Sequence, residues 1–110
     1  MSRRTIPGLT HLQFLVLSIL RAGPRAGRQV RKALARYGVK RSAPAFYQMM
    51  ARLERARLVE GWYEQITVGD QAVTERRYRL RPAGEKLWSE TREFYHKASP
   101  ALPRERWSDA

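Results

Sequence analysis

The sequence predicts a single α+β domain, mostly helical, in which three helices are followed by a β-hairpin and a last helix. Two observations lead to this prediction. Apolar residues recur every three or four positions in three segments before residue 58 and in one segment after residue 82, as in amphipathic helices. Between these segments, from Gly61 to Leu80, polarity changes every second residue around a glycine turn, as in β-strands. The length of 110 residues suits one domain with a modest core.

The first helix is predicted from about His11 to Arg21, ending at an Ala-Gly-Pro sequence. Thr10 and Gln13 have the spacing of a capping box, which marks the start of a folded helix. Two arginines ahead of this apolar run resemble a secretion signal, but the run is too short to span a membrane. We therefore expect a structural helix and a cytoplasmic protein.

The second and third helices are close together. The second is predicted from about Gly27 to Tyr37, with Gly38 as the left-handed residue that ends it. The third follows with Ser42 as N-cap and Pro44 in its first turn, where the missing N–H costs nothing. Two helices joined by a short glycine-containing turn, the second amphipathic and led by cations, form a helix-turn-helix.

The hairpin is predicted as two strands, 61–68 and 73–80, around a turn at 69–71, and it corresponds to a wing. A last helix is expected from about Pro82 to Ala98. The prediction divides the chain into a flexible basic arm (1–8), a winged helix-turn-helix DNA-binding domain (9–81), a C-terminal dimerisation helix (82–99) and a loose tail (100–110).

The net charge of +12 lies in the first half of the chain. Thirteen Lys and Arg and a single acid, Glu54, lie from Met1 to Arg57, whereas nine basic and nine acidic residues follow. A one-sided positive field attracts polyanions, so nucleic acid is the leading expected partner and an anionic membrane surface the second. The alternative is a solubilising face, but such faces usually mix both signs.

The residues that enzymes and metal sites need are scarce. Cysteine is absent, which excludes disulfides and thiolate ligands, and there is no glycine-rich phosphate loop. The two histidines, His11 and His96, belong to separate predicted helices and form no ligand cluster. We expect neither an enzyme nor a cofactor or metal site.

Three segments resemble one family. They are LQFLVLSILRAGPRAG at the start, FYQMMARLERARLVEG after the capping serine, and YRLRPAGEKL where the hairpin ends. From about Leu9 to Tyr95 the chain resembles the PadR-like (phenolic acid decarboxylase regulator) family of bacterial transcription factors. The resemblance implies a winged-helix regulator that works on the bacterial nucleoid and dimerises through its C-terminal helix.

The chain also departs from the family pattern. Arg28 follows Gly27 where the family usually has tyrosine, Arg57 stands where a glycine commonly closes the third helix, and Arg81 replaces a threonine. The wing has Glu-Arg-Arg at 75–77 instead of a Gly-Arg-Pro-like tip. The fold tolerates these changes, but the DNA sequence that family members read does not transfer to this chain.

An operator-reading helix needs polar side chains for base edges and cations for phosphates. We expect Lys40, Arg41 and the Ser42 end of the third helix to bind the phosphate backbone of the DNA. Gln48 is expected to pair with an adenine edge, or to be simply solvated. Tyr47 is expected to meet a phosphate or a thymine methyl, or to be a half-buried ring.

Further arginines are weaker candidates. Arg52 contacts phosphate or solvates the helix, and Arg76 and Arg77 lie on two faces of a strand, so one should point outward. Arg28, Lys32 and Arg36 form a phosphate track or a solvated face; the absence of an intervening acid favours the track. The predicted DNA-binding residues are Arg28, Lys32, Lys40, Arg41, Ser42, Tyr47, Gln48, Arg52, Arg76 and Arg77.

The resemblance also suggests a dimer interface and an effector site. The predicted interface consists of Leu12, Leu87, Trp88, Thr91, Phe94, Tyr95 and Ala98. Because some relatives hold small aromatic compounds between such helices, Trp88, Phe94 and Tyr95 are candidates for an effector pocket. An aromatic stripe at helical spacing is more often core or interface.

The leading hypothesis is a homodimeric, sequence-specific transcriptional regulator, a repressor that occludes a promoter by binding a palindromic site in double-stranded DNA. One alternative is an architectural nucleic-acid-binding protein with little sequence preference. Another is a winged-helix protein–protein adaptor. A regulator keeps its preference for one operator when salt is added, whereas an architectural protein binds all duplexes with a steep salt dependence. An adaptor does not bind DNA.

Overall fold

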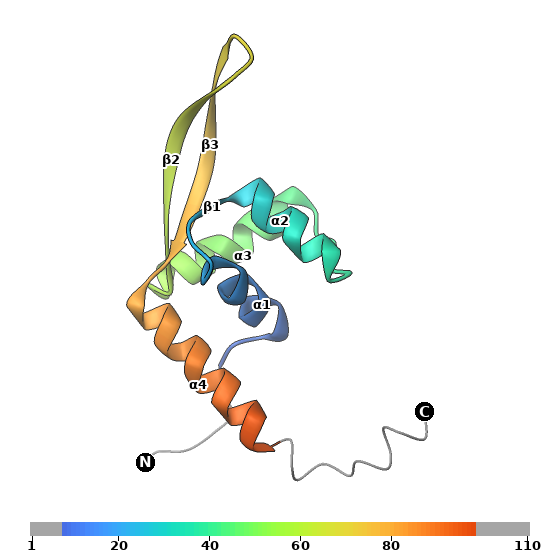
Figure 1. Cartoon of the computed structure of the whole chain (residues 1–110), viewed down its shortest axis with the longest axis vertical. Coiled ribbons are helices and arrows are strands. Elements are labelled where there is room, and N and C mark those ends of the chain that lie inside the picture. The colour runs from blue at the N-terminus through green and yellow to red at the C-terminus, as the bar shows by residue number, and fades with distance from the viewer. Residues whose placement is uncertain (1–7, 99–110) are drawn as a thin grey trace.

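The computed structural model describes residues 8–98, which fold into four α-helices and a three-stranded antiparallel sheet. In chain order the elements are α1 (His11–Leu20), β1 (Arg25–Ala26), α2 (Gly27–Arg36), α3 (Ala43–Arg55), β2 (Val59–Val68), β3 (Gln71–Leu80) and α4 (Pro82–Ala98) (Figure 1). The predicted winged helix-turn-helix with a trailing helix is therefore confirmed. Of the predicted basic arm only Gly8 is described, and the predicted tail at 100–110 lies outside the described residues.

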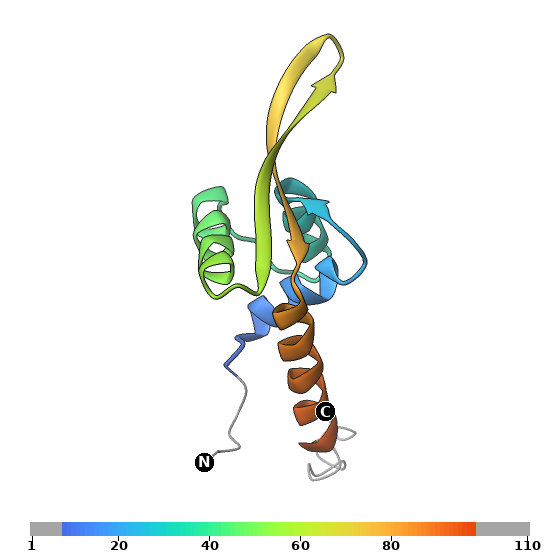
Figure 2. The ribbon, with the colours of Figure 1, turned by 90° about the vertical axis from the view of Figure 1, so that its left-hand side faces the viewer.

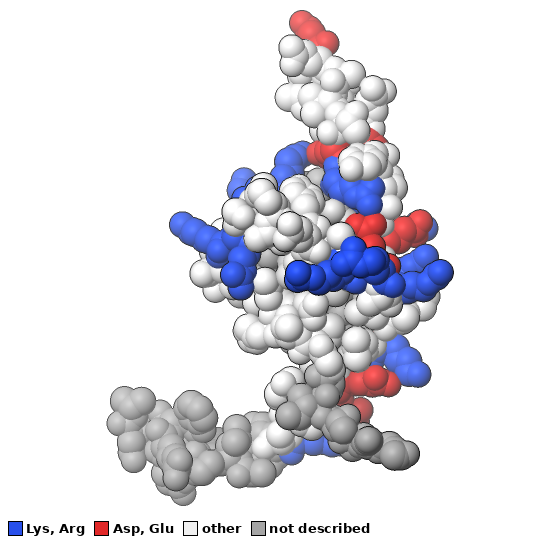
Figure 3. Space-filling view, turned by 180° about the vertical axis from the view of Figure 1, so that it is seen from behind, with Lys and Arg blue, Asp and Glu red and all other residues white. Residues whose placement is uncertain are grey.

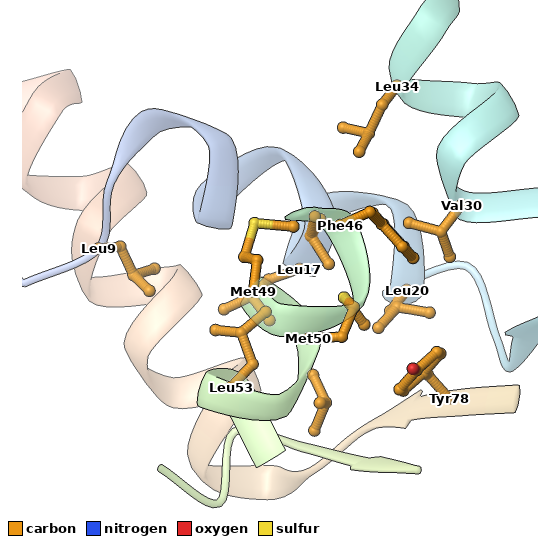
Figure 4. Packing of buried hydrophobic residues seen from close by; sticks show 12 residues of the cluster. Leu9, Leu17, Leu20, Val30, Leu34, Phe46, Met49, Met50, Leu53 and Tyr78 are labelled. Atoms are coloured by element: carbon orange, nitrogen blue, oxygen red, sulfur yellow. The ribbon is translucent and has the colours of Figure 1, made fainter. Parts of the chain in front are cut away.

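The core lies where α1, α2 and α3 meet the base of the hairpin. Figure 4 shows Leu17 and Leu20 of α1, Phe46 and Met50 of α3 and the ring of Tyr78 pointing toward one another. Burying each of these side chains stabilises the fold by about 1.5–3 kcal/mol. The full cluster consists of Leu9, Val16, Leu17, Leu20, Val30, Leu34, Phe46, Met49, Met50, Leu53, Val59 and Tyr78.

The helix starts follow their capping residues. The Thr10 hydroxyl accepts a hydrogen bond from the Gln13 N–H at 3.0 Å, and the Gln13 amide oxygen accepts one from the Thr10 N–H at 3.0 Å. The Ser42 hydroxyl accepts the N–H of Ala45 at 3.2 Å. Both predicted caps are confirmed, and they set the direction in which α1 and α3 leave their turns.

The residue that follows α3 has a left-handed backbone conformation although it is not a glycine. Arg57 has a φ of 63°, in the left-handed region that glycine occupies most easily, whereas α2 is followed by Gly38 at 81°. The arginine that replaces the family's closing glycine therefore keeps the glycine conformation. It lets the chain turn from α3 into β2, with the Leu58 N–H bonded to the Leu53 carbonyl at 3.0 Å.

The sheet has one more strand than the sequence predicted. The two residues of β1 pair with β3, Arg25 opposite Tyr78 and Ala26 opposite Arg77, so the strand order is β1-β3-β2. Sequence periodicity cannot detect a strand of two residues. The hairpin turn is also tighter than expected, because Gln71 pairs with Val68 and leaves only the residues 69 and 70 between the strands.

The hairpin and α4 extend from the helical part in opposite directions (Figures 1 and 2). Gly84 lets α4 start close to the base of the hairpin, because a Cβ atom there would collide with the Leu58 carbonyl oxygen. This contact explains the glycine in the YRLRPAGEKL segment. No helix within residues 8–98 combines the length and apolar character needed to cross a bilayer.

Candidate nucleic-acid interface

One face of α3 is committed to the core and the other is open. Phe46, Met49, Met50 and Leu53 are buried, as expected from the amphipathic pattern. The exposed side presents Pro44, Ala45, Gln48, Arg52 and Arg55. Gln48 and Arg52 thus lie one turn apart on the open face, where a duplex could meet them.

A groove runs between α2 and the start of α3, with a volume of about 420 Å³. Five cations line it, and its lining holds no acid among the described residues. We call it the cationic groove; its residues are Arg28, Arg31, Lys32, Leu34, Ala35, Val39, Lys40, Arg41 and Phe46. The predicted pairs Arg28–Lys32 and Lys40–Arg41, which are separate in sequence, are brought together here.

The charges on the surface are unevenly spread. Figure 3 shows Lys and Arg in a band across the helical part, whereas the far half of the hairpin is uncharged up to an acidic tip. Residues 65–74 indeed contain no Lys or Arg. A second hollow, lined by Arg25, Arg28, Lys32 and Arg36 among others, continues the positive surface along α2.

The expectation that no acid faces the α2 stripe is wrong for Arg28. Its guanidinium lies 3.1 Å from the Glu75 carboxylate of β3, although the arginine side chain is still 64% exposed. The prediction considered only α2, and the partner is supplied by the wing. Within residues 8–98, Lys32, Lys40 and Arg41 take part in no side-chain ion pair.

The arginines at the base of the wing are also paired. Arg76 lies 2.7 Å from Glu54 of α3 and over the ring of Tyr63, at 4.5 Å from the ring centroid. Arg77 lies 3.1 Å from Glu75 and 3.6 Å from Glu64. Both side chains are about a quarter exposed and engaged with carboxylates, and the prediction that one of them reaches a phosphate stays a prediction. They connect the hairpin internally and to α3.

Tyr47 is a half-buried ring that packs edge-on against Phe46, with 4.9 Å between the ring centroids. Its hydroxyl lies at the start of α2, where a Cβ atom on Gly27 would stand 2.7 Å away. Of the two alternatives predicted for Tyr47, the half-buried ring is the one that the structure has. The ring fixes the position of α2 on α3. Ser42, by contrast, is exposed beside the cationic groove.

One contributor was not assigned from the sequence. Arg31 lines the cationic groove and donates a hydrogen bond to the Arg41 carbonyl at 3.0 Å. It thereby ties α2 to the turn that carries Lys40 and Arg41. The only signal in the sequence is its spacing, three residues after Arg28.

The first half of α4 is held against α1. The Trp88 ring stacks on Phe14 at 5.7 Å, its N–H donates to the Ser18 hydroxyl at 2.7 Å, and the Arg21 guanidinium lies 3.7 Å from its centroid. Arg21 also pairs with Glu85 at 2.9 Å and lowers the pKa of that carboxyl through this hydrogen bond.

The remaining predicted interface residues divide into two groups. Thr91 is buried within its own chain and donates to the Leu87 carbonyl at 2.8 Å. Leu12, Leu87, Phe94 and Ala98 are half-buried, and Tyr95 is 54% exposed. A hollow of about 450 Å³ beside Tyr95 is lined by Leu9, Thr10, His11, Phe14, Thr91, Arg92 and Tyr95. Neither Trp88 nor Phe94 lines this hollow, and the effector pocket at Trp88, Phe94 and Tyr95 stays a prediction.

Solved structures share this architecture over most of the chain. A PadR family transcription regulator from Clostridium difficile R20291 is 15% identical, with a TM-score of 0.72 and 84% of this chain and 94% of that chain covered. A PadR-like transcriptional regulator from Bacillus cereus is 18% identical, with a TM-score of 0.69 and coverage of 82% and 85%. A PadR family transcriptional regulator from Eggerthella lenta is 26% identical, with a TM-score of 0.60 and coverage of 79% and 76%.

These neighbours confirm the resemblance that the sequence predicted, because they are PadR-like regulators aligned across most of the chain. Identities of 15–26% show the shared fold. No family model and no curated protein matches the chain. Within the described residues, no three His, Cys, Asp or Glu side chains come together as a metal site.

Proposed function

We propose that this chain is a PadR-like DNA-binding transcriptional regulator, which acts as a homodimer on a palindromic operator and represses by occluding a promoter. The regulator performs no chemistry. It works on the nucleoid, and its effect depends on how long it occupies the duplex.

The observation that carries the proposal is the position of the cationic groove beside the open face of α3. A helix that enters the major groove needs cations beside it, because phosphate backbones border that groove. Lys32, Lys40 and Arg41 meet this need, since no carboxylate of the described chain neutralises them. A surface of this kind supplies the salt-dependent part of the affinity.

The sequence preference is assigned to the open face of α3. Gln48 is suited to a bidentate pair with an adenine edge, and Arg52, one turn further, to a guanine edge or a phosphate. Arg76 and Arg77 would have to leave their carboxylate partners to reach a phosphate. They are therefore secondary to the cations of the groove.

Dimerisation is assigned to the side of α4 that α1 leaves uncovered. The far end of α4 projects away from the helical part (Figures 1 and 2), and Phe94 and Tyr95 pack edge to face on it with centroids 5.0 Å apart. A second copy on Phe94, Tyr95, Ala98 and the exposed edge of Leu12 would cover this apolar surface. Two-fold symmetry then sets two α3 helices about 34 Å apart, one turn of duplex.

Selection of bound fragments from a random duplex pool tests the proposal. The affinities of the winners and of a scrambled duplex are then compared at two salt concentrations, and the molecular mass in solution is measured by sedimentation. Enrichment of a palindrome with half-sites one turn apart, bound by a dimer, is the expected result. Binding without enrichment that collapses in salt would instead indicate an architectural protein, and no binding an adaptor.

A further inference from the structure

The exposed part of the first turn of α3 is apolar. Pro44 and Ala45 face solvent at the end of the helix that lies beside Lys40 and Arg41. Neither side chain donates or accepts a hydrogen bond. The front of the proposed reading helix therefore has no exposed polar side chain between the cationic groove and Gln48, except the capping Ser42.

The backbone at residues 44–46 offers no free donor in place of the missing polar side chains. Pro44 has no N–H, the Ala45 N–H is bonded to the Ser42 hydroxyl at 3.2 Å, and the Phe46 N–H to the Ser42 carbonyl at 2.9 Å. The proline lacks one of the donors that helix starts commonly offer to anions or base edges, and the cap occupies another, that of Ala45. At residues 44 and 45 the surface therefore consists of a pyrrolidine ring and a methyl group.

The major groove offers one apolar partner for such a surface. Guanine, cytosine and adenine edges present hydrogen-bond donors and acceptors, and thymine alone adds a C5-methyl group. Placing Ala45 against a donor or acceptor of a base would displace the water bound to that polar group without replacing its hydrogen bond, which is unfavourable. Placing it against a thymine methyl buries two apolar groups, which is favourable.

The position of the two residues fits a base-reading role. Gln48 lies three residues after Ala45 and four after Pro44, so all three lie on one face of α3. The cations of the groove flank this face at its N-terminal end. A duplex held by those cations would therefore meet Ala45 next to the base pair that Gln48 reads.

Resting on the proposed function, we infer that Ala45, with Pro44 beside it, is a specificity-determining residue that recognises the C5-methyl group of thymine. The site thus distinguishes thymine from cytosine and from uracil at one or two positions of each half-site. Gln48 and Arg52 read neighbouring positions through hydrogen bonds.

The test uses the duplex that the selection experiment enriches. Each thymine of one half-site, and its symmetry mate, is replaced in turn by uracil, which removes only the methyl group, and Kd is measured for each duplex. For the unchanged protein, one or two replacements should weaken binding about fourfold per methyl lost, the value expected for burying one such group. The other replacements should leave Kd unchanged.

Protein variants assign the effect to its residue. In Ala45→Gly the ratio of uracil to thymine Kd should fall to near one at those positions, and in Ala45→Ser it should fall likewise. Ala43→Gly is the matched control, because it also replaces a first-turn alanine of α3 by glycine, at a half-buried position away from the open face. Its ratio should stay at about fourfold per methyl lost, as in the unchanged protein. Since each ratio is taken within one protein, a change in stability cancels.

The outcomes separate this inference from the function on which it rests. If no duplex is enriched, the proposed regulator and the inference both fail. If a duplex is enriched but no uracil replacement weakens binding, or the effect persists in Ala45→Gly and Ala45→Ser, the regulator stands and Ala45 is not its thymine reader.

Discussion

Tyr47 covers Gly27 so closely that a Cβ atom on Gly27 would lie 2.7 Å from the tyrosine hydroxyl oxygen and 2.8 Å from a ring carbon. The two residues form the joint between α2 and α3, because Gly27 is the first residue of α2 and the Tyr47 ring is on α3. The orientation of the cationic groove relative to the open face of α3 depends on this joint.

Gly27→Ala should therefore destabilise the protein. The added methyl group forces the half-buried ring out of its place, and overpacking of this kind costs about 1–3 kcal/mol. Urea unfolding, followed by far-UV circular dichroism, measures the loss. In a Tyr47→Ala background the same change should cost little, because the ring is gone. Additive losses in the double variant would mean that the two residues do not interact.

Arg57→Gly should stabilise the protein. Arg57 pays the steric penalty of the left-handed region at a φ of 63°, and glycine avoids it at the expense of a more flexible unfolded chain. The net gain should be about 0.5–1 kcal/mol, seen as a higher Tm.

Ala56→Gly is the matched control for that change, since Ala56 has a right-handed φ of −79° just before Arg57. It gains nothing from glycine and should lower Tm. An equal shift in the same direction for both variants would exclude backbone strain at Arg57 as the cause.

The buried Tyr78 should make stability fall at alkaline pH. Burial raises the pKa of Tyr78 to about 12, against 10.0 for an ordinary tyrosine, and the Arg76 guanidinium opposes part of the shift. The unfolded state therefore loses this proton first. Below pH 10 this group leaves the free energy of unfolding independent of pH, and between pH 10 and 12 it lowers that free energy as the pH rises, by about 3 kcal/mol in all.

Comparison with Tyr78→Phe isolates this contribution from that of the lysines, which titrate in the same range. Urea unfolding at intervals from pH 8 to pH 12 gives both stability curves. The curve of the unchanged protein should drop more steeply above pH 10. Parallel curves would show that the Tyr78 hydroxyl ionises equally easily in the folded and unfolded states.

Arg41→Ala and Gln48→Ala should differ in kind. Loss of Arg41 removes a phosphate contact, so all duplexes should weaken about equally and the slope of log K against log salt should become shallower by about one. Loss of Gln48 should relax preference at one base pair by about 1–3 kcal/mol and leave the salt slope unchanged. Titrations of selected and scrambled duplexes at several salt concentrations measure both. Equal effects of the two variants on every duplex would contradict the assignment.

The sequence predicted most of the fold because most of its signals are local. The caps Thr10 and Ser42 determine helix starts within three residues of themselves, and the apolar period indicates which face of α3 is buried. The strand β1 was missed, since two residues have no period and pair only with a distant strand.

The charges of the site were harder to predict because their partners are distant in sequence. Arg28 and Glu75 are 47 residues apart, and Arg76 and Glu54 are 22 residues apart. Only the folded hairpin brings these pairs together. Consequently the distribution of charge along the sequence indicated the first half of the chain, whereas the structure of residues 8–98 was needed to show which of its cations have carboxylate partners.

The last prediction follows from these pairs. Glu75 is a carboxylate with two arginine neighbours, Arg28 at 3.1 Å and Arg77 at 3.1 Å, at the border of the cationic groove. Glu75→Gln removes its charge with little change of shape and releases the side chain of Arg28 for a phosphate. Affinity for every duplex should rise, and the slope of log K against log salt should become steeper. The ratio of the affinities for selected and scrambled duplexes should become smaller.

Glu90→Gln is the control, because it removes the same charge from the exposed side of α4, away from the groove. It should leave both affinity and slope nearly unchanged. If Glu90→Gln strengthens binding as much as Glu75→Gln does, net charge alone explains the gain. If Glu75→Gln weakens binding instead, the ion pair with Glu75 holds Arg28 in the orientation that DNA binding needs. The wing then supports the interface structurally and does not reduce its affinity by neutralising Arg28.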